Sequence, residues 1–461
     1  MKENNFVSEF KNPGGIKEVW LIAYPLIINT SSYTIMQFVD RSMLAWFHPD
    51  ALAAIIPAGI LSFTIIALFM GIAMYSNVFV AQYFGKKKFA SMSVSLWQGV
   101  FVGFLSTLII LAFTPIGMWI LGSTNHAEIV KIMEKQYFLI LNLFGGLIVI
   151  NHALASFFTG QGKTKITMWA NVIGNMVNIL FAYLMIFGKA GFPVMGIKGA
   201  AWSTIFGNVV ILIIYLVIIF SEKNRKIFKT SRLFGFYYPA FKRLVKFGVP
   251  SGVSFCLDIL AFSVFVFLIG NIDKISLAAS NILIAIEMLV FMPVLGLAIA
   301  GETLVGQYMG RKMPDISAKA AISTFKIAIG YALSIGVLFW LFPNWFVDFF
   351  AIGMKNRSAD MQMILSTAYP LMKIIALFIV FDVFFIVFGH AIRGAGDTRY
   401  HMKWMILCSW LFFVPCAYLI SKYAPSVQNM WICGCIYVFL LGLVMTIRFY
   451  SNKWRKFDIT A

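Results

Sequence analysis

Long runs of apolar residues dominate this sequence, and they leave few folds open to the chain. Twelve segments are long and apolar enough to cross a membrane, and short polar clusters such as residues 48–50 separate them. A helix needs about 20 residues to cross the hydrocarbon layer of a bilayer. Lipid cannot hydrogen-bond to the backbone, so a spanning segment is either a helix or a strand of a closed barrel. The alternation typical of a barrel is absent, and the sequence therefore predicts an all-α membrane protein with twelve transmembrane helices.

The charged fraction supports a membrane location. Only 12% of the 461 residues are charged, about half of the usual share in a soluble domain. The predicted spans are residues 17–46, 52–84, 92–121, 129–158, 164–187, 197–221, 241–271, 276–309, 317–349, 362–392, 399–421 and 427–450. The N-terminal residues lack the short apolar core and cleavage site of a signal peptide, so we expect the first span to remain in the protein. The five cysteines lie in apolar stretches without metal-site spacing, and we interpret them as packing residues.

The positive charges indicate the orientation. The chain has 37 Lys and Arg against 18 Asp and Glu, a formal net charge of +19. With the N-terminus on the cytoplasmic side, 26 of the basic residues fall in cytoplasmic segments and 8 in outer loops. Such a bias is typical of membrane proteins, whose cytoplasmic loops are enriched in Lys and Arg. We therefore predict a multi-pass protein of the cell membrane (the cytoplasmic membrane if bacterial) with both termini in the cytoplasm, and no nucleic-acid partner.

The two halves of the chain resemble each other. Residues 71–87 and 296–312 share the pattern G-x-A followed by V-x-Q-Y-x-G-K/R-K, at an offset that also relates Pro25 to Pro250. A second pattern, G-x-G-x-T-K/R, begins at Gly160 and again at Gly394. A duplicated six-helix unit enters the membrane from the same side twice, so its copies are expected to be related by a pseudo-two-fold axis along the membrane normal.

The repeat predicts the domain organisation. We expect an N-terminal lobe over residues 1–221, a basic cytoplasmic linker over 222–240 and a C-terminal lobe over 241–461. Two parallel six-helix lobes are a transporter architecture, and substrate sites in such folds lie near the membrane midplane between the repeats.

Three carboxylates lie deep in the predicted spans of the second half. Asp258 and Glu287 are near the middle of their spans, and Asp382 is slightly cytoplasmic of the middle. A carboxylate at bilayer depth costs about 2.5–3.5 kcal/mol on insertion scales, so such residues usually face a cavity and have a function. We predict a cation-coupling site at these acids, with Na⁺ able to bind at Asp258 and Asp382, and no other metal site. A structural ion pair is the weaker alternative for each.

The first half has a different polar pattern. Asp40 shares a helical stripe with Tyr33 and Gln37, which makes a secondary substrate or proton site one interpretation. Snorkelling of Asp40 to the outer interface is an equally good one. Asn171, Asn175 and Asn178 form another stripe. Asn175 and Asn178 are candidates for the same site, although interhelical hydrogen bonding is the simpler role for such amides.

The remaining polar and proline positions suggest gating or structural roles. Glu302 lies near the cytoplasmic end of its span, where Arg311 or Lys312 is a candidate partner, and coupling is an alternative role. Pro25 and Pro250 are expected to bend their helices, because an interior proline removes a backbone hydrogen bond. His152 and His390 are isolated in the sequence, and we expect them to have packing or junction roles. No P-loop, zinc-protease motif or catalytic triad is evident, so we predict neither an enzyme nor a cofactor.

Several short motifs, taken in their order along the chain, resemble those of the multidrug and toxic compound extrusion (MATE) family. The resemblance covers nearly the whole chain. The motif residues are Pro25, Phe38 to Asp40, Ala51 to Ala54, Gln82 with Gly85, Gly160 to Lys163, Asn175 with Asn178, Gly199 to Trp202, Pro250, Asp258, Gln307 with Gly310, Asp382 and Arg393 with Gly394.

The resemblance implies an antiporter that exports amphipathic, often cationic organic compounds and is driven by Na⁺ or H⁺. Asp258 and Asp382 match the cation-binding acids of the NorM-type branch. The additional helix-five acid of the DinF-type branch is Ala182 here, and residues 45–49 replace the glycines common before the alanine-rich motif. We expect a monomer in the bilayer that binds a small-molecule substrate and a coupling cation. The alternatives are a lipid-linked saccharide flippase of the wider superfamily and a membrane scaffold or receptor that transports nothing.

Overall fold

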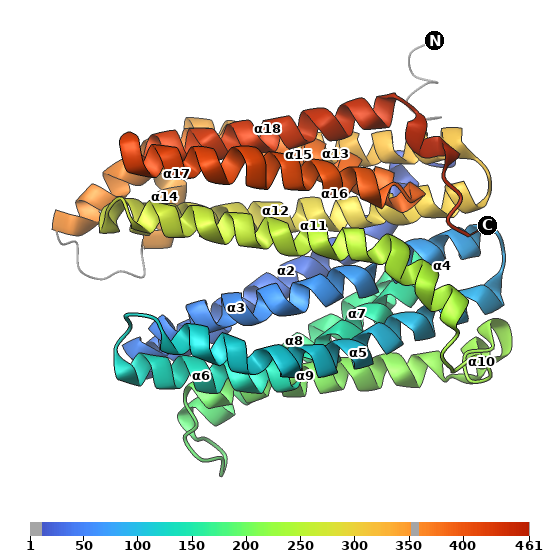
Figure 1. Cartoon of the computed structure of the whole chain (residues 1–461), viewed down its shortest axis with the longest axis horizontal. Coiled ribbons are helices and arrows are strands. Elements are labelled where there is room, and N and C mark those ends of the chain that lie inside the picture. Colours follow the sequence, from blue (N-terminus) through green and yellow to red (C-terminus); the bar gives the residue numbers. More distant parts are fainter. Residues whose placement is uncertain (1–11, 352–358, 461) are drawn as a thin grey trace. The chain divides into compact units, whose positions relative to one another are not determined.

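The computed structural model describes residues 12–351 and 359–460, and their regular structure is entirely helical (Figure 1). Among these residues, eleven helices are long and apolar enough to cross a membrane, or up to twelve if one bent pair is a single span. The predicted all-α membrane class is thereby confirmed, and the predicted twelve spans are reached when the bent pair counts as one. Four of the basic residues counted for orientation, Lys2, Lys11, Lys355 and Arg357, lie outside the described residues.

The helices of the first half follow the predicted spans closely. They are α2 (Ile16–Phe47), α3 (Pro49–Met74), α4 (Ser76–Gly85), α5 (Phe89–Gly122), α6 (Glu128–Leu143), α7 (Gly145–Gly160), α8 (Thr164–Phe187), α9 (Ile197–Ile219) and the short α10 (Glu222–Phe228). The second half contains α11 (Tyr238–Gly270), α12 (Lys274–Gly310), α13 (Pro314–Leu341), α14 (Pro343–Ala351), α15 (Ala359–Ala395), α16 (Thr398–Ile406), the π-helical turn η1 (Leu407–Phe413), α17 (Val414–Tyr423), α18 (Val427–Tyr450) and η2 (Lys453–Lys456).

Three spans are less regular than predicted. The segment 129–158 consists of α6 and α7, which meet at Phe144 with a bend of 44°. The segment 317–349 breaks before Pro343, because proline has no N–H to continue α13 but fits the first turn of α14. The segment 399–421 contains η1, whose hydrogen bonds span one residue more than those of an α-helix.

Helix ends carry local signals that the sequence contains. Asp273 precedes α12, and its carboxylate accepts hydrogen bonds from the Ser276 N–H at 2.7 Å and the Ser276 hydroxyl at 2.6 Å. Such an N-cap satisfies a backbone N–H that has no partner inside the helix. At the end of α8, Gly188 has a φ of +66°, which glycine adopts without steric cost.

The chain forms two compact units, and each is described by itself. One contains the described residues up to Ile27 together with Leu257–Asp458, and the other contains Ile28–Cys256 with the C-terminal residues from Ile459. Both units therefore share α2 and α11, each of which changes unit shortly after its proline, Pro25 or Pro250. The division into lobes at residues 222–240 follows the sequence repeat and stays a prediction.

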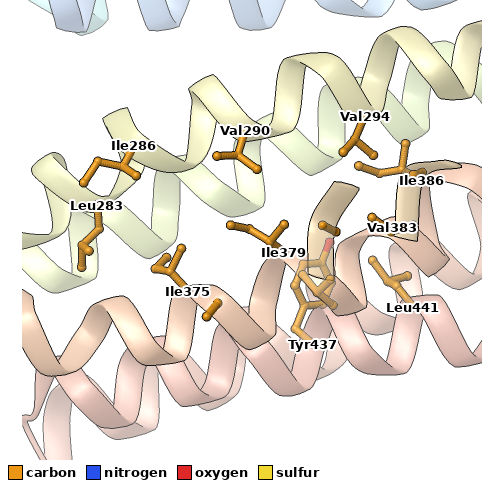
Figure 2. Packing of buried hydrophobic residues seen from close by; sticks show 14 of the residues in the cluster. Leu283, Ile286, Val290, Val294, Ile375, Ile379, Val383, Ile386, Tyr437 and Leu441 are labelled. Atoms are coloured by element: carbon orange, nitrogen blue, oxygen red, sulfur yellow. The ribbon is translucent and has the colours of Figure 1, made fainter. Parts of the chain in front are cut away.

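Apolar faces of α12 and α15 form the core of the unit that contains the second half. Figure 2 shows the two helices facing each other, with α18 completing the cluster. The contributing positions recur at the three- and four-residue spacing of one helix face. They are Leu283, Ile286, Val290 and Val294 on α12, Ile375, Ile379, Val383 and Ile386 on α15, and Tyr437 and Leu441 on α18. Among the residues that Figure 2 labels, Tyr437 alone has a hydroxyl group, and the others are aliphatic.

In the other unit, close contact between α5 and α7 depends on glycines. A Cβ built on Gly146 of α7 would lie 2.8 Å from the Gly103 carbonyl oxygen, and one on Gly103 would lie 3.0 Å from the Ile150 nitrogen. Small residues at such crossings let helix backbones approach each other, which is how helices commonly pack in membranes.

Candidate functional site

Three carboxylates from different helices interact electrostatically within one unit. Asp258 of α11, Glu287 of α12 and Asp382 of α15 are near enough for their charges to repel one another. Asp382 is 9% exposed and the other two are half-buried. The structure therefore brings together the three acids that the sequence singles out as a cation-coupling site.

No basic side chain neutralises this group among the residues that the structure describes. None of the three acids takes part in an ion pair there. Lys373, which shares α15 with Asp382, lies over the ring of Trp340 at 5.6 Å. Negative charge that is buried without a positive partner is costly, so the group favours a bound cation or protonation of its members. No three His, Cys, Asp or Glu side chains in the described chain gather closely enough to hold a metal ion by themselves.

Tyr437 is the residue of this site that sequence reasoning missed. Its hydroxyl lies 3.2 Å from Asp258 Oδ1, to which it can donate, and 3.5 Å from the Met405 sulfur. The Tyr437 ring stacks on Phe413 with 4.5 Å between ring centroids. Phe413 ends η1, and Trp410 of the same turn donates from its indole nitrogen to the Leu257 carbonyl at 3.3 Å. A tyrosine in an apolar span carries no sequence signal that separates it from ordinary core residues.

In the other unit, Asp40 is buried next to amide side chains. It is 6% exposed, and its Oδ1 has no hydrogen-bond partner among the residues that the structure describes. The Asn178 side chain of α8 faces this carboxylate and donates to the Thr204 hydroxyl at 3.2 Å. Asn175 donates to Ser32 of α2 at 2.9 Å. Asp40 is therefore buried within its unit, and the structure places it beside one of the two predicted asparagines.

The other members of these stripes have different surroundings. Gln37 donates to the Tyr33 hydroxyl at 2.8 Å, and this pair is on an exposed part of α2. Asn171 donates to the Tyr215 hydroxyl at 2.9 Å and to the Thr167 carbonyl at 2.8 Å. Asn171 thus links α8 to α9, which is the simple helix-joining role considered for the asparagine stripe.

Glu302 is paired with residues other than those predicted. It is 4% exposed, and its carboxylate lies 2.5 Å from His390 Nδ1 and 3.7 Å from Arg393 Nη2. The suggested partners Arg311 and Lys312 were wrong, because both follow the end of α12 at Gly310 and are more than two helical turns beyond Glu302. Arg311 instead lies over the Tyr308 ring at 5.0 Å. His390 is consequently part of a buried ionic cluster that joins α12 to α15.

The remaining residues are the two predicted prolines and one buried acid that the sequence does not single out. Pro25 and Pro250 lie inside helices that continue past them. Glu134 of α6 is fully buried and lies 2.7 Å from His126 Nδ1. Glu134 lies close to the beginning of a predicted span, where an acid gives no sequence signal of a buried site.

The chain matches a family model, MatE, over residues 25–184 and again over residues 250–419. The two matches begin at Pro25 and Pro250, the pair that aligns the sequence repeat. Among curated proteins, the chain is 25% identical to a probable multidrug resistance protein NorM of Thermotoga maritima, covering 98% of this chain and 96% of the relative. It is 26% identical to the uncharacterised transporter YisQ of Bacillus subtilis, covering 94% of each.

Solved structures share the fold over nearly the full length. A MOP superfamily transporter from Pyrococcus furiosus, described as having a binding pocket of reverse polarity, has a TM-score of 0.84 at 20% identity, covering 97% of both chains. An outward-facing multidrug resistance MATE family transporter also has a TM-score of 0.84 at 20% identity, covering 97% of this chain and 98% of its own. At this level of identity, the likeness concerns the fold alone.

Proposed function

The chain belongs to the MatE family of membrane transporters, and from this premise we propose that it is a secondary active antiporter that exports amphipathic, cationic organic compounds in exchange for Na⁺ or H⁺. Family members are transporters and not enzymes, and they need no cofactor. Several relatives carry the name multidrug resistance protein, which supports drugs and other foreign compounds as the cargo.

One observation carries the coupling proposal, namely the cluster of Asp258, Glu287 and Asp382 without a basic partner in the described chain. A proton on one carboxyl or a Na⁺ between two of them relieves the mutual repulsion of the charges. An organic cation that enters the same field competes with the coupling ion for this negative charge. Such competition links the two fluxes, because binding of one ligand weakens binding of the other.

The proposed cycle is alternating access by two lobes, which is the general scheme of such folds. Ion binding at the three acids favours the outward-open state, from which the organic compound leaves. Asp40, with Asn178 beside it, is the proposed secondary substrate or proton site. Tyr33, Gln37 and Asn175 are its proposed outer contacts, and residues 45–49 tune the range of compounds. Both termini are proposed to be cytoplasmic, and the functional form is proposed to be a monomer in the cell membrane.

The alternatives make different demands on the same residues. A lipid-linked saccharide flippase commonly needs a cationic lumen, whereas the described part of this chain places three acids together without a basic partner. A scaffold or receptor predicts no ion-driven flux, and its buried acids would be paired and replaceable together.

The test is dye efflux from proteoliposomes that contain the purified protein, with Na⁺ and pH gradients imposed separately. We expect one gradient to drive export of a cationic dye and Asp382→Asn to abolish it while the protein still folds. Asp315→Asn is the matched control, because Asp315 is exposed in the first turn of α13 and pairs with Arg455. Wild-type export by Asp382→Asn, or no response to either gradient, would refute the proposal.

A further inference from the structure

The basic segment that connects the two halves is held in place by buried hydrogen bonds. Trp97 of α5 donates to the Thr230 carbonyl at 2.9 Å, and Ser93 donates to the Phe228 carbonyl at 2.7 Å. Gln98 donates to the Gly235 carbonyl at 3.0 Å and accepts from the Tyr237 N–H at 3.1 Å. Residues 222–240, which include α10 in Figure 1, are therefore held against the first turns of α5.

The surface of this segment carries an excess of positive charge. Residues 222–240 contain five basic residues and one acidic residue, Glu222, which pairs with Lys226 at 2.5 Å. The side chains of Arg225, Lys229 and Arg232 are exposed. Lys163, in the neighbouring turn between α7 and α8, lies over the Phe228 ring at 5.1 Å. Burial, and to a smaller extent the nearby positive charge of Lys223, lower the pKa of Lys163.

Aromatic side chains border the same surface. Phe234 and Phe236 are 57% and 55% exposed, and Tyr237 and Tyr238 are 55% and 61% exposed. The Phe234 ring packs against Trp97 with 4.6 Å between centroids, and the Phe236 ring packs against Phe101 with 5.5 Å.

These rings continue the apolar side of a membrane-spanning helix. Phe101 contacts Phe104 at 6.3 Å, and Phe104 is 54% exposed on α5. An exposed phenylalanine on a spanning helix faces lipid, so the aromatic residues of the linker lie where the bilayer surface begins. Aromatic rings at this depth are typical of the interface between lipid and water.

We propose that residues 222–240 form a docking surface for the phosphate headgroups of anionic membrane phospholipids. Arg225, Lys229 and Arg232 bind the phosphates, while Phe234 and Phe236 insert among the upper acyl groups. Basic residues beside a membrane are attracted to anionic lipids, and the attraction weakens with salt. The inference depends on the chain spanning a membrane and is independent of what the protein transports.

The test measures retained lipid and uses the full-length protein in a neutral detergent. Phosphatidylglycerol or phosphatidylcholine is titrated in, and bound lipid is counted by native mass spectrometry. The test variant is the triple replacement Arg225→Gln, Lys229→Gln and Arg232→Gln. Its control removes the same charge from three exposed lysines elsewhere in the chain, Lys189→Gln, Lys198→Gln and Lys274→Gln.

We expect the wild type to retain more phosphatidylglycerol than phosphatidylcholine. In the test variant, the ratio of the two bound lipids is expected to fall at least about tenfold, because each basic residue near a charged membrane surface contributes about fivefold. The control variant is expected to keep the preference, and added salt to weaken it in the wild type. Phe236→Ala is expected to reduce retention of both lipids. Thermal unfolding without lipid verifies that the variants are folded. If the triple variant does not fold, the single replacement Arg232→Gln takes its place.

Three results would overturn the proposal. They are equal retention of both lipids by the wild type, equal losses in the test and control variants, and displacement of phosphatidylglycerol by a short RNA that depends on the same three residues. The last result would assign the surface to nucleic acid.

Discussion

At the scale of single residues, the buried acids fall into two kinds. Glu302 lies between His390 and Arg393, whereas Asp382 has two other carboxylates as its charged neighbours. A paired acid stabilises the unit that contains it, whereas an acid surrounded by like charges destabilises its unit. The same substitution, from an acid to its amide, is therefore expected to have opposite consequences at the two positions.

We expect Glu302→Gln to lower the unfolding free energy, and Glu302→Ala to lower it by about 3–5 kcal/mol, because each leaves buried positive charge uncompensated. Asp382→Asn is expected to leave stability unchanged or to raise it, since it removes repulsion. Thermal unfolding in detergent measures both. Loss of stability in Asp382→Asn equal to that in Glu302→Gln would contradict the distinction.

A second prediction concerns Tyr437. Replacing it with phenylalanine keeps the ring stacked on Phe413 and removes the hydroxyl that lies 3.2 Å from Asp258. We expect Tyr437→Phe to fold normally and to shift the coupling-ion concentration at half-maximal transport, because the charged form of Asp258 loses a donor. Ion titrations of transport check this. Tyr215→Phe, which removes a hydroxyl from the other unit, is the control and is expected to leave the ion dependence unchanged.

At the scale of helices, the distance to a neighbouring helix and the capping of the helix end determine how much a substitution changes the free energy of unfolding. Gly146 and Gly330 are both helical glycines, but only Gly146 is pressed against another helix. We expect Gly146→Ala to destabilise the fold by about 1–3 kcal/mol, because the added methyl overpacks the crossing of α5 and α7. Gly330→Ala is expected to stabilise by about 0.5–1 kcal/mol, since no atom of the described chain lies within 4 Å of the new methyl. Comparable effects in unfolding measurements would contradict the packing argument.

The N-cap of α12 gives a prediction about pH. Burial raises the pKa of Asp273, but hydrogen bonds from the Ser276 hydroxyl and N–H outweigh it and hold the pKa below its usual value. The stabilisation by this cap is therefore fully present above about pH 4 and is lost as the pH falls through the lowered pKa. Asp273→Ala is expected to cost about 0.5–2 kcal/mol at neutral pH, and Asp273→Asn much less.

Unfolding measured between neutral and acidic pH checks the cap. The difference between the wild type and Asp273→Ala is expected to narrow as the pH falls, because the wild-type carboxylate becomes protonated. A difference that stays constant with pH would show that the charge of Asp273 does not contribute.

The regular helices could be predicted because a run of about twenty apolar residues in a membrane forms a helix, which satisfies its backbone hydrogen bonds within the segment. The bend at Phe144 could not, since bent and continuous spans have the same composition, whereas the break before Pro343 has a local signal in the proline, which hydropathy alone does not register. Asp258, Glu287 and Asp382 stood out because carboxylates are rare at this depth. Tyr437 and the pairing of Glu302 with His390 depend on contacts between helices far apart in sequence, which hydropathy does not contain.

At the scale of the whole molecule, the bent pair α6 and α7 decides the topology. If it crosses the membrane once, the chain has an even number of spans and both termini lie on one side. We expect both termini, and the linker with its excess of Lys and Arg, to be cytoplasmic. Cysteines introduced at each end into a variant without the five native thiols are expected to react with a membrane-impermeant maleimide only after lysis. Labelling of one terminus in intact cells would mean an odd number of spans.

The π-helical turn at Leu407–Phe413 has a consequence for how the sequence tolerates change. Such a turn holds one residue more than an α-helix of the same hydrogen-bonded length. Removing a single residue there lets the helix close into regular α form, and the residues after it keep nearly the same faces because the turn itself absorbs the missing residue. A single-residue deletion in a regular part of a span instead rotates every later residue by about 100°. Single-residue deletions are therefore expected to be tolerated better within Leu407–Phe413 than elsewhere in the spans, as long as Phe413 stays stacked on Tyr437.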